Sequence, residues 1–175
     1  MNLGPYVIIK LTPAMIETAH QMAKELGHLR NSIEEGAGNI TGFCGELACK
    51  KFFGIPYEEI QNTYHFDILL NGITYDVKSK KRKDPPRNYY EASVANFNTS
   101  QQCNFYLHTS VTWPERLAAP TEVHLCGFYP KEKYMQEARF LKKGDLDGSN
   151  KFTVKADCWN MFYKDLNSVK EIKRS

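Results

Sequence analysis

The hydrophobic and polar positions along the chain follow patterns that predict both helices and strands. Residues 6–9 form a short β-prone run, and Thr12-Pro13 then supplies the N-cap and the first residue of a helix. Apolar side chains recur at helical spacing as far as Leu26, opposite a polar face, which predicts an amphipathic helix ending near Gly27. The glycine-containing stretch 30–42 predicts a loop and lacks the sequence of a phosphate-binding loop.

Further elements follow from the same patterns. A second helix carrying Glu46 is predicted over residues 43–53 and should end at Gly54. Later strands are predicted at 89–94, 105–109, 123–129 and 152–154, and later helices at 131–140 and 159–166. Because no repeat or long linker divides the chain, we expect a single domain over residues 1–175, of the mixed α/β class.

Two β-prone runs on either side of Asn71-Gly72 predict a β-hairpin, because this dipeptide favours a two-residue turn with positive φ angles. Such a turn fixes the register of the two strands. The predicted pairs on the apolar side are Leu70–Ile73, Ile68–Tyr75 and Phe66–Val77. The predicted pairs on the polar side are Leu69–Thr74, Asp67–Asp76 and His65–Lys78.

Composition excludes several classes of protein. The 175 residues are 42% hydrophobic and 25% charged, which is typical of a globular domain and not of a disordered chain. The chain contains no run of 18 apolar residues, which is the length needed to cross a membrane, and its N-terminus lacks the pattern of a signal peptide. The five cysteines lack Cys-x-x-Cys spacing and indicate reduced thiols. We therefore expect a cytoplasmic protein that is not secreted and has no membrane partner.

The charge of the chain is concentrated in one segment. Residues 78–83 read Lys-Ser-Lys-Lys-Arg-Lys, and without them the chain has 18 basic against 20 acidic residues. Such a cluster on a near-neutral body indicates a polyanionic partner, although a solvated loop or an import signal has the same composition. The expected phosphate-binding cations are Lys80, Lys81, Arg82, Lys83 and Arg87.

The predicted hairpin places Asp67 directly opposite Asp76, and this pair is the most informative feature of the sequence for chemistry. Like charges at facing positions destabilise a strand pair, so the hairpin must either expose both carboxylates to water or neutralise them with a cation. Oxygen ligands of this kind suit Mg²⁺ or Mn²⁺. Lys78 lies two residues beyond Asp76 and therefore on the same face, where it could act on a metal-bound water or on a phosphate.

Asp67 followed after eight residues by Asp76-Val77-Lys78 resembles the core motif of the PD-(D/E)xK nuclease superfamily. The resemblance covers residues 42–106, including Glu46 in Gly-x-x-Gly-Glu-Leu on the preceding helix. Gln102-x-x-x-Tyr106, with Gln101 as a neighbouring candidate, is similar to a motif of branches associated with recombination exonucleases. The compact domain is also similar to nucleases encoded by phages.

The resemblance implies a restriction-endonuclease-like fold, in which helices flank a mixed β-sheet on both sides. It also implies that Glu46, Asp67, Asp76 and the carbonyl of Val77 hold the metal, and that Lys78 serves the attacking water. The resulting hypothesis is a Mg²⁺- or Mn²⁺-dependent deoxyribonuclease. The alternative is a module of the same fold that binds nucleic acid without cutting it. The sequence does not distinguish DNA from RNA as the substrate, or cleavage inside strands from cleavage at ends. It also leaves open whether the protein forms a homodimer.

Overall fold

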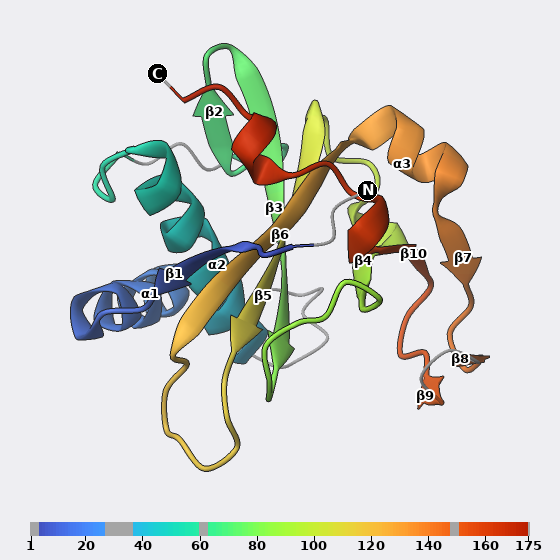
Figure 1. Cartoon of the computed structure of the whole chain (residues 1–175), viewed down its shortest axis with the longest axis horizontal. Coiled ribbons are helices and arrows are strands. Elements are labelled where there is room, and N and C mark those ends of the chain that lie inside the picture. The colour runs from blue at the N-terminus through green and yellow to red at the C-terminus, as the bar shows by residue number, and fades with distance from the viewer. Residues whose placement is uncertain (1–3, 27–36, 60–62, 148–150, 175) are drawn as a thin grey trace.

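The computed structural model describes residues 4–26, 37–59, 63–147 and 151–174. Its centre is a five-stranded sheet in the order β1-β6-β5-β3-β2, in which β3 and β5 are parallel and all other neighbours are antiparallel (Figure 1). These strands are β1 (Val7–Lys10), β2 (Ile68–Leu70), β3 (Ile73–Arg82), β5 (Phe105–Thr112) and β6 (Glu122–Pro130). The predicted mixed α/β class is confirmed. Within the described ranges, no helix has the length and apolar character needed to cross a membrane.

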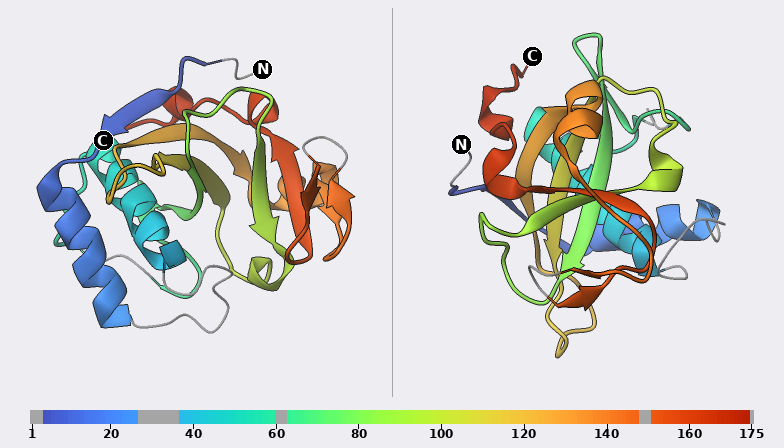
Figure 2. Two further views of the ribbon diagram at one scale, coloured as in Figure 1. Left: turned by 90° about the horizontal axis from the view of Figure 1, so that it is seen from below. Right: turned by 90° about the vertical axis from the view of Figure 1, so that its right-hand side faces the viewer.

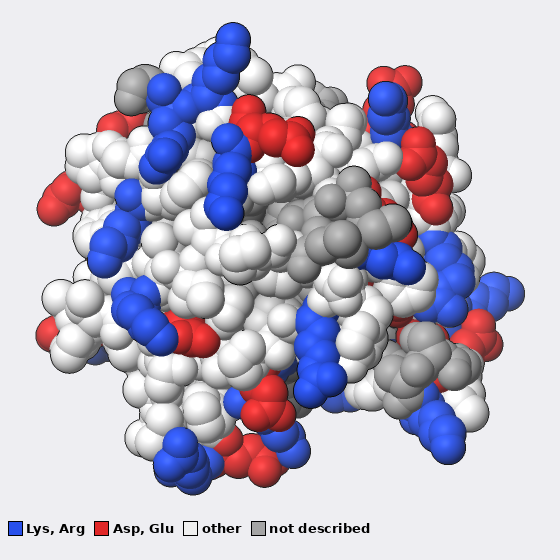
Figure 3. Space-filling view, viewed as in Figure 1, with Lys and Arg blue, Asp and Glu red and all other residues white. Residues whose placement is uncertain are grey.

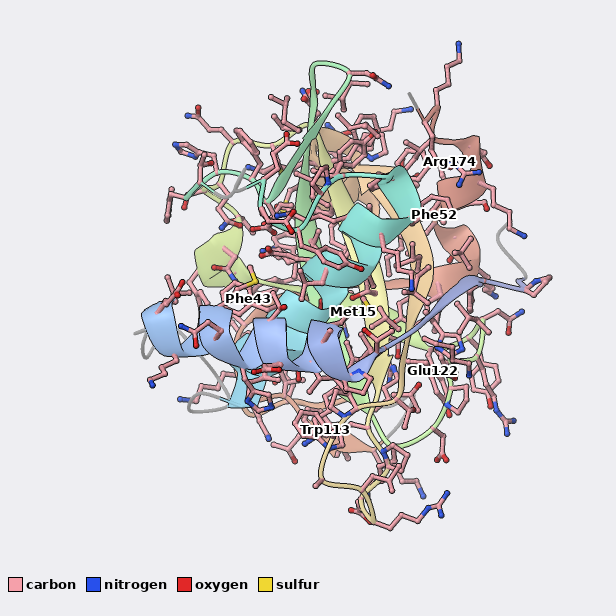
Figure 4. All side chains as sticks on the ribbon, turned by 90° about the vertical axis from the view of Figure 1, so that its left-hand side faces the viewer. Met15, Phe43, Phe52, Trp113, Glu122 and Arg174 are labelled. Atoms are coloured by element: carbon pink, nitrogen blue, oxygen red, sulfur yellow. The ribbon has the colours of Figure 1, made fainter. Side chains whose placement is uncertain are left out.

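Helices α1 (Pro13–Leu26) and α2 (Ala37–Phe53) cover one face of this sheet. The predicted N-cap is confirmed, since the Met15 backbone N–H donates to Thr12 Oγ1 at 3.2 Å. Figure 4 shows Met15 where α1 crosses α2. The predicted loop over 30–42 is wrong from residue 37 onward, because α2 begins there. Apolar side chains packed against the sheet outweigh the poor helix propensity of Gly38 and Gly42. Residues 27–36 of that loop lie outside the described residues.

A second, three-stranded sheet covers the other face, in the order β4-β10-β7 (Figure 2). It contains β4 (Glu91–Ala95), β7 (Arg139–Leu141) and β10 (Cys158–Phe162), and the short helix α3 (Lys131–Glu137) lies beside it. The remaining elements are the hairpin β8 (Leu146–Asp147) and β9 (Phe152–Thr153), and the 3-10 turns η1 (Asn96–Asn98), η2 (Tyr163–Asp165) and η3 (Val169–Glu171). The expectation of helices on both sides therefore needs correction, because among the described residues this face is covered by a sheet with α3 beside it.

Two predicted helices differ from the structure near the C-terminus. The predicted helix over 159–166 is wrong, because residues 158–162 form β10, the central strand of the second sheet. The predicted helix over 131–140 ends at Glu137, and β7 follows at once. Both corrections have one cause. Pairing of β10 with β4 and with β7 satisfies the backbone of these segments, so tertiary context overrides local propensity.

The predicted hairpin turn is confirmed, with φ of 52° at Asn71 and 77° at Gly72. The register is also confirmed from Leu70–Ile73 through Leu69–Thr74 to Ile68–Tyr75, where the ladder ends. The predicted pairs of Asp67 with Asp76, of Phe66 with Val77 and of His65 with Lys78 are not part of this ladder. Instead β2 leaves β3 at Asp67, whose side chain takes the place of the missing strand. The Val77 backbone N–H donates to Asp67 Oδ2 at 2.8 Å.

Two glycines of α2 provide a matched test of how closely this helix packs on the sheet. A Cβ atom at Gly45 would lie 2.0 Å from Ser79 Oγ and 2.7 Å from Thr109 Oγ1, whereas one at Gly42 would meet nothing within 4 Å. Gly45→Ala should therefore destabilise the protein by about 1 kcal/mol, the cost of forcing short side chains aside. Gly42→Ala should stabilise it by roughly 0.5–1 kcal/mol through lower backbone entropy of the unfolded chain. Urea unfolding of both variants measures the difference, and equal effects would contradict this packing.

Candidate active site

Asp67 and Asp76 meet at the point where β2 separates from β3. The Asp76 carboxyl group lies close enough to that of Asp67 to contribute to a raised pKa of Asp67. Only 3% of the surface of Asp76 is exposed, and Asp67 is partly buried. An exposed face that tolerates both charges in water is therefore the wrong interpretation. The fold gathers two carboxyl groups in a shielded place, where their mutual repulsion is weakly screened.

The surroundings of Asp67 disfavour its negative charge. Burial, followed by the nearby charges of Glu46 and Asp76, raises the pKa of Asp67 well above its usual value, although the hydrogen bond from the Val77 N–H opposes the shift. Glu46 comes from α2 and is itself buried. The helix thus brings Glu46 close enough for its charge to act on Asp67.

Lys78 lies on the same face of β3 as Asp76, as the strand periodicity predicts. Its Nζ is 2.6 Å from Asp76 Oδ2, and it donates a hydrogen bond to Gln101 Oε1 at 3.0 Å. Its ammonium group also lies 5.8 Å from the centre of the Tyr106 ring. The side chain is 15% exposed, so the amine can reach solvent or substrate while both partners hold its position.

The residue before β5 that contacts Lys78 is Gln101 and not Gln102, whose side chain is exposed. Gln101 Nε2 donates to the Tyr64 backbone carbonyl oxygen at 3.0 Å. The backbone carbonyl of Gln101 accepts a hydrogen bond from Lys131 Nζ. The Gln102 backbone N–H donates to His65 Nδ1 at 3.1 Å. The segment before Asp67 and the segment before β5 are thus joined around Lys78. Sequence reasoning missed Lys131 and Tyr64, because this junction forms only in the tertiary structure.

His108 lies beside Lys78 in the parallel ladder of β3 and β5. It is completely shielded and stacks on Tyr134, with 5.4 Å between the ring centres. Burial, and then the nearby charges of Lys78 and Lys80, lower the pKa of His108 to about 3. His108 is therefore neutral at physiological pH and adds no competing positive charge next to Lys78. No pattern in the sequence distinguishes it from the other four histidines.

The donor groups of the site fit a magnesium or manganese ion. Within the described parts of the chain, no three His, Cys, Asp or Glu side chains form a preassembled metal cluster. Mg²⁺ typically keeps several waters and binds through only one or two carboxylates, so a pair of carboxylates such as Asp67 and Asp76 matches the number of protein ligands that it needs. The carbonyl of Val77 points to the same edge of β3 as its N–H, which bonds Asp67. A divalent cation would also neutralise the repulsion between the carboxylates.

The basic segment does not form the single cationic cluster that the sequence predicted. Because residues 78–82 belong to β3, alternate side chains point to opposite faces. Lys80 Nζ and Arg82 Nη2 both donate to the Glu91 carbonyl between the two sheets, at 3.2 and 3.1 Å. Burial, followed by the charge of Arg82, lowers the pKa of Lys80 to about 8. Lys80 and Arg82 thus connect the sheets and are not displayed to a phosphate backbone.

The other cations of this segment lie on the surface. Lys81 Nζ lies 4.2 Å from the Trp113 ring centre, Lys83 pairs with Glu115, and Arg87 Nη1 donates to the Tyr89 hydroxyl at 3.2 Å. On the face shown in Figure 3, Lys and Arg are interspersed with Asp and Glu and do not gather in one patch. Of the five predicted phosphate-binding cations, Lys81, Lys83 and Arg87 therefore remain available to a ligand.

Comparison with protein-family models, with curated proteins and with solved structures gives no match for this chain.

Proposed function

We propose that this protein is a divalent-metal-dependent nuclease that hydrolyses phosphodiester bonds in DNA. The observation that carries the proposal is the shielded Asp67–Asp76 pair with Lys78 held 2.6 Å from Asp76. Two gathered carboxylates that need a cation, with an amine fixed beside them, are suited to cleavage of a phosphate ester. The resemblance of this segment to the PD-(D/E)xK motif supports the same reaction and adds the restriction-endonuclease-like fold as part of the proposal.

Each residue of the site has a defined task in this reaction. Asp67 and Asp76 would hold Mg²⁺ or Mn²⁺ together with the Val77 carbonyl, and Glu46 would complete the acidic surroundings. The metal, when bound, lowers the pKa of a coordinated water and neutralises charge on the phosphate. Lys78 orients the attacking water and stabilises the negative charge that develops on the phosphate oxygens. Gln101 fixes the Lys78 amine and so limits the positions that it can occupy.

Incubation of the purified protein with supercoiled plasmid and with linear DNA tests the proposal. Cleavage should occur with Mg²⁺ or Mn²⁺ and should stop when EDTA is added. A plasmid that is nicked or linearised indicates internal cleavage, whereas shortening of only the linear DNA indicates cleavage from ends. If the protein binds DNA and cuts neither substrate with any divalent metal, the nuclease proposal fails. The noncatalytic binding module is then the better account.

A further inference from the structure

Tyr64 is an exposed aromatic residue next to the proposed catalytic lysine. One glutamine side chain separates the two residues, since Gln101 Oε1 accepts from Lys78 Nζ and Gln101 Nε2 donates to the Tyr64 carbonyl, each at 3.0 Å. Tyr64 nevertheless exposes 66% of its surface. None of the catalytic tasks described above uses its ring. An exposed ring at this distance from the chemistry can contact whatever lies beside the reacting phosphate.

The ring of Tyr64 is also held in place. Its hydroxyl is 3.2 Å from Ser100 Oγ, and its ring meets that of His65 edge to face, with 5.1 Å between the ring centres and 77° between the planes. His65 is itself fixed, because its Nδ1 accepts from the Gln102 backbone N–H. Contacts at the hydroxyl, at the ring and at the backbone reduce the entropy lost when a ligand packs on the ring.

We propose that Tyr64 binds an unpaired nucleobase by stacking, next to the phosphodiester that Lys78 addresses. This inference rests on the proposed nuclease function and names its substrate class, which is single-stranded DNA or a frayed DNA end. Every base has an aromatic face that can stack on a tyrosine, so such a subsite is tolerant of sequence. In an intact duplex both faces of an internal base are covered by its neighbours. An intact duplex therefore has no exposed internal base on which Tyr64 could stack until the strands separate.

Binding measurements without metal test the stacking separately from cleavage. Fluorescence anisotropy in EDTA gives the Kd of a labelled single-stranded oligothymidine for wild type, Tyr64→Ala and Tyr64→Phe. Tyr64→Ala should bind about 10-fold more weakly, the usual loss for one base–aromatic stack, while Tyr64→Phe should stay within about 2-fold of wild type. Phe152→Ala is the matched control, because Phe152 is an exposed aromatic on β9, far from β2 in Figure 1. It should bind like wild type.

A strand in which abasic linkers replace the bases identifies the contact as stacking. Wild type should bind this strand more weakly than oligothymidine. Tyr64→Ala should bind it with the same affinity as wild type. Affinity for a closed duplex hairpin should be the same in all four proteins. Unaltered single-strand binding by Tyr64→Ala would overturn the inference, and so would equal losses in Tyr64→Ala and Tyr64→Phe. Far-UV circular dichroism and thermal unfolding confirm that each variant is folded.

The subsite and the nuclease proposal fail in different ways. Loss of single-strand binding in Tyr64→Ala without cleavage by wild type supports the subsite and contradicts the nuclease. Metal-dependent cleavage by wild type, together with wild-type affinity in Tyr64→Ala, contradicts the subsite and leaves the nuclease intact.

Discussion

Replacing Lys78 by methionine is expected to lower the rate of metal-dependent DNA cleavage by at least about 100-fold, the usual loss for a general acid–base or charge-stabilising group. Methionine keeps most of the volume of the side chain and removes the amine that lies 2.6 Å from Asp76 Oδ2. The rate should be measured at saturating DNA, so that weaker binding does not enter the result. Lys133→Met is the matched control, because Lys133 is exposed on α3. It should cleave at the wild-type rate.

Stability complicates the Lys78 variant, and a second variant resolves the difficulty. Removing the cation leaves Asp76 buried without its ion-pair partner, which costs about 3 kcal/mol or more of folding free energy. The double variant Lys78→Met/Asp76→Asn removes both charges and should recover much of that stability. It should still be inactive, because neither the amine nor the carboxylate is present. Cleavage at the wild-type rate by either folded protein would show that the reaction does not use this site.

Asp67→Asn is expected to stabilise the metal-free protein at pH 8, although it should abolish cleavage. The reason is the raised pKa of Asp67 in the folded state, caused first by burial and then by Glu46 and Asp76. Asparagine carries no charge, and its side-chain oxygen can still accept the hydrogen bond from the Val77 N–H. The variant therefore removes the repulsion and keeps the contact that replaces the missing strand.

The same pKa shift predicts how wild type and Asp67→Asn differ in their pH dependence. Above the pKa of an unfolded aspartate, near 4, the Asp67 carboxyl binds more protons in the folded protein than in the unfolded chain. Its contribution to the free energy of unfolding therefore falls as the pH rises from about 4 toward the raised pKa, whereas His108, whose pKa is lowered to about 3, contributes the opposite slope in both proteins. Chemical unfolding in EDTA across this range should show that the free energy of unfolding of wild type falls relative to that of Asp67→Asn. A free energy that instead rises with pH equally in both proteins would contradict the assignment.

The sequence predicted the central part of the site because its information is local there. Asn71-Gly72 and the alternation around it determined the register of the hairpin, which placed Asp67 near Asp76 and Lys78 on the same face as Asp76. Glu46 was found through a resemblance of motifs, and the packing of α2 on the sheet brings it near Asp67. Each of these placements depends on one hairpin or on one helix packed on a strand.

The parts that sequence reasoning missed depend on contacts between distant segments. The β10 segment contains no feature that distinguishes it from a helix, and pairing with β4 and β7 determines its structure. Gln102 fitted the motif by spacing, yet Gln101 reaches Lys78 because the turn before β5 orients it. The composition of residues 78–83 predicts a cluster of exposed charge. The position of this segment within β3 turns Lys80 inward to Glu91, which composition does not reveal.

Calorimetric titration with Mn²⁺ tests most directly the central claim that Asp67 and Asp76 form a metal site. Wild type should bind the ion saturably and release protons, because the ion favours the ionised form of the Asp67 carboxyl, whose pKa is raised in the metal-free protein. Proton release appears as a dependence of the binding enthalpy on the ionisation enthalpy of the buffer. Asp67→Asn/Asp76→Asn should lose both the binding and the buffer dependence, and the exposed-acid control Glu132→Gln should keep both. Unchanged Mn²⁺ affinity and proton release in the double variant would contradict the account.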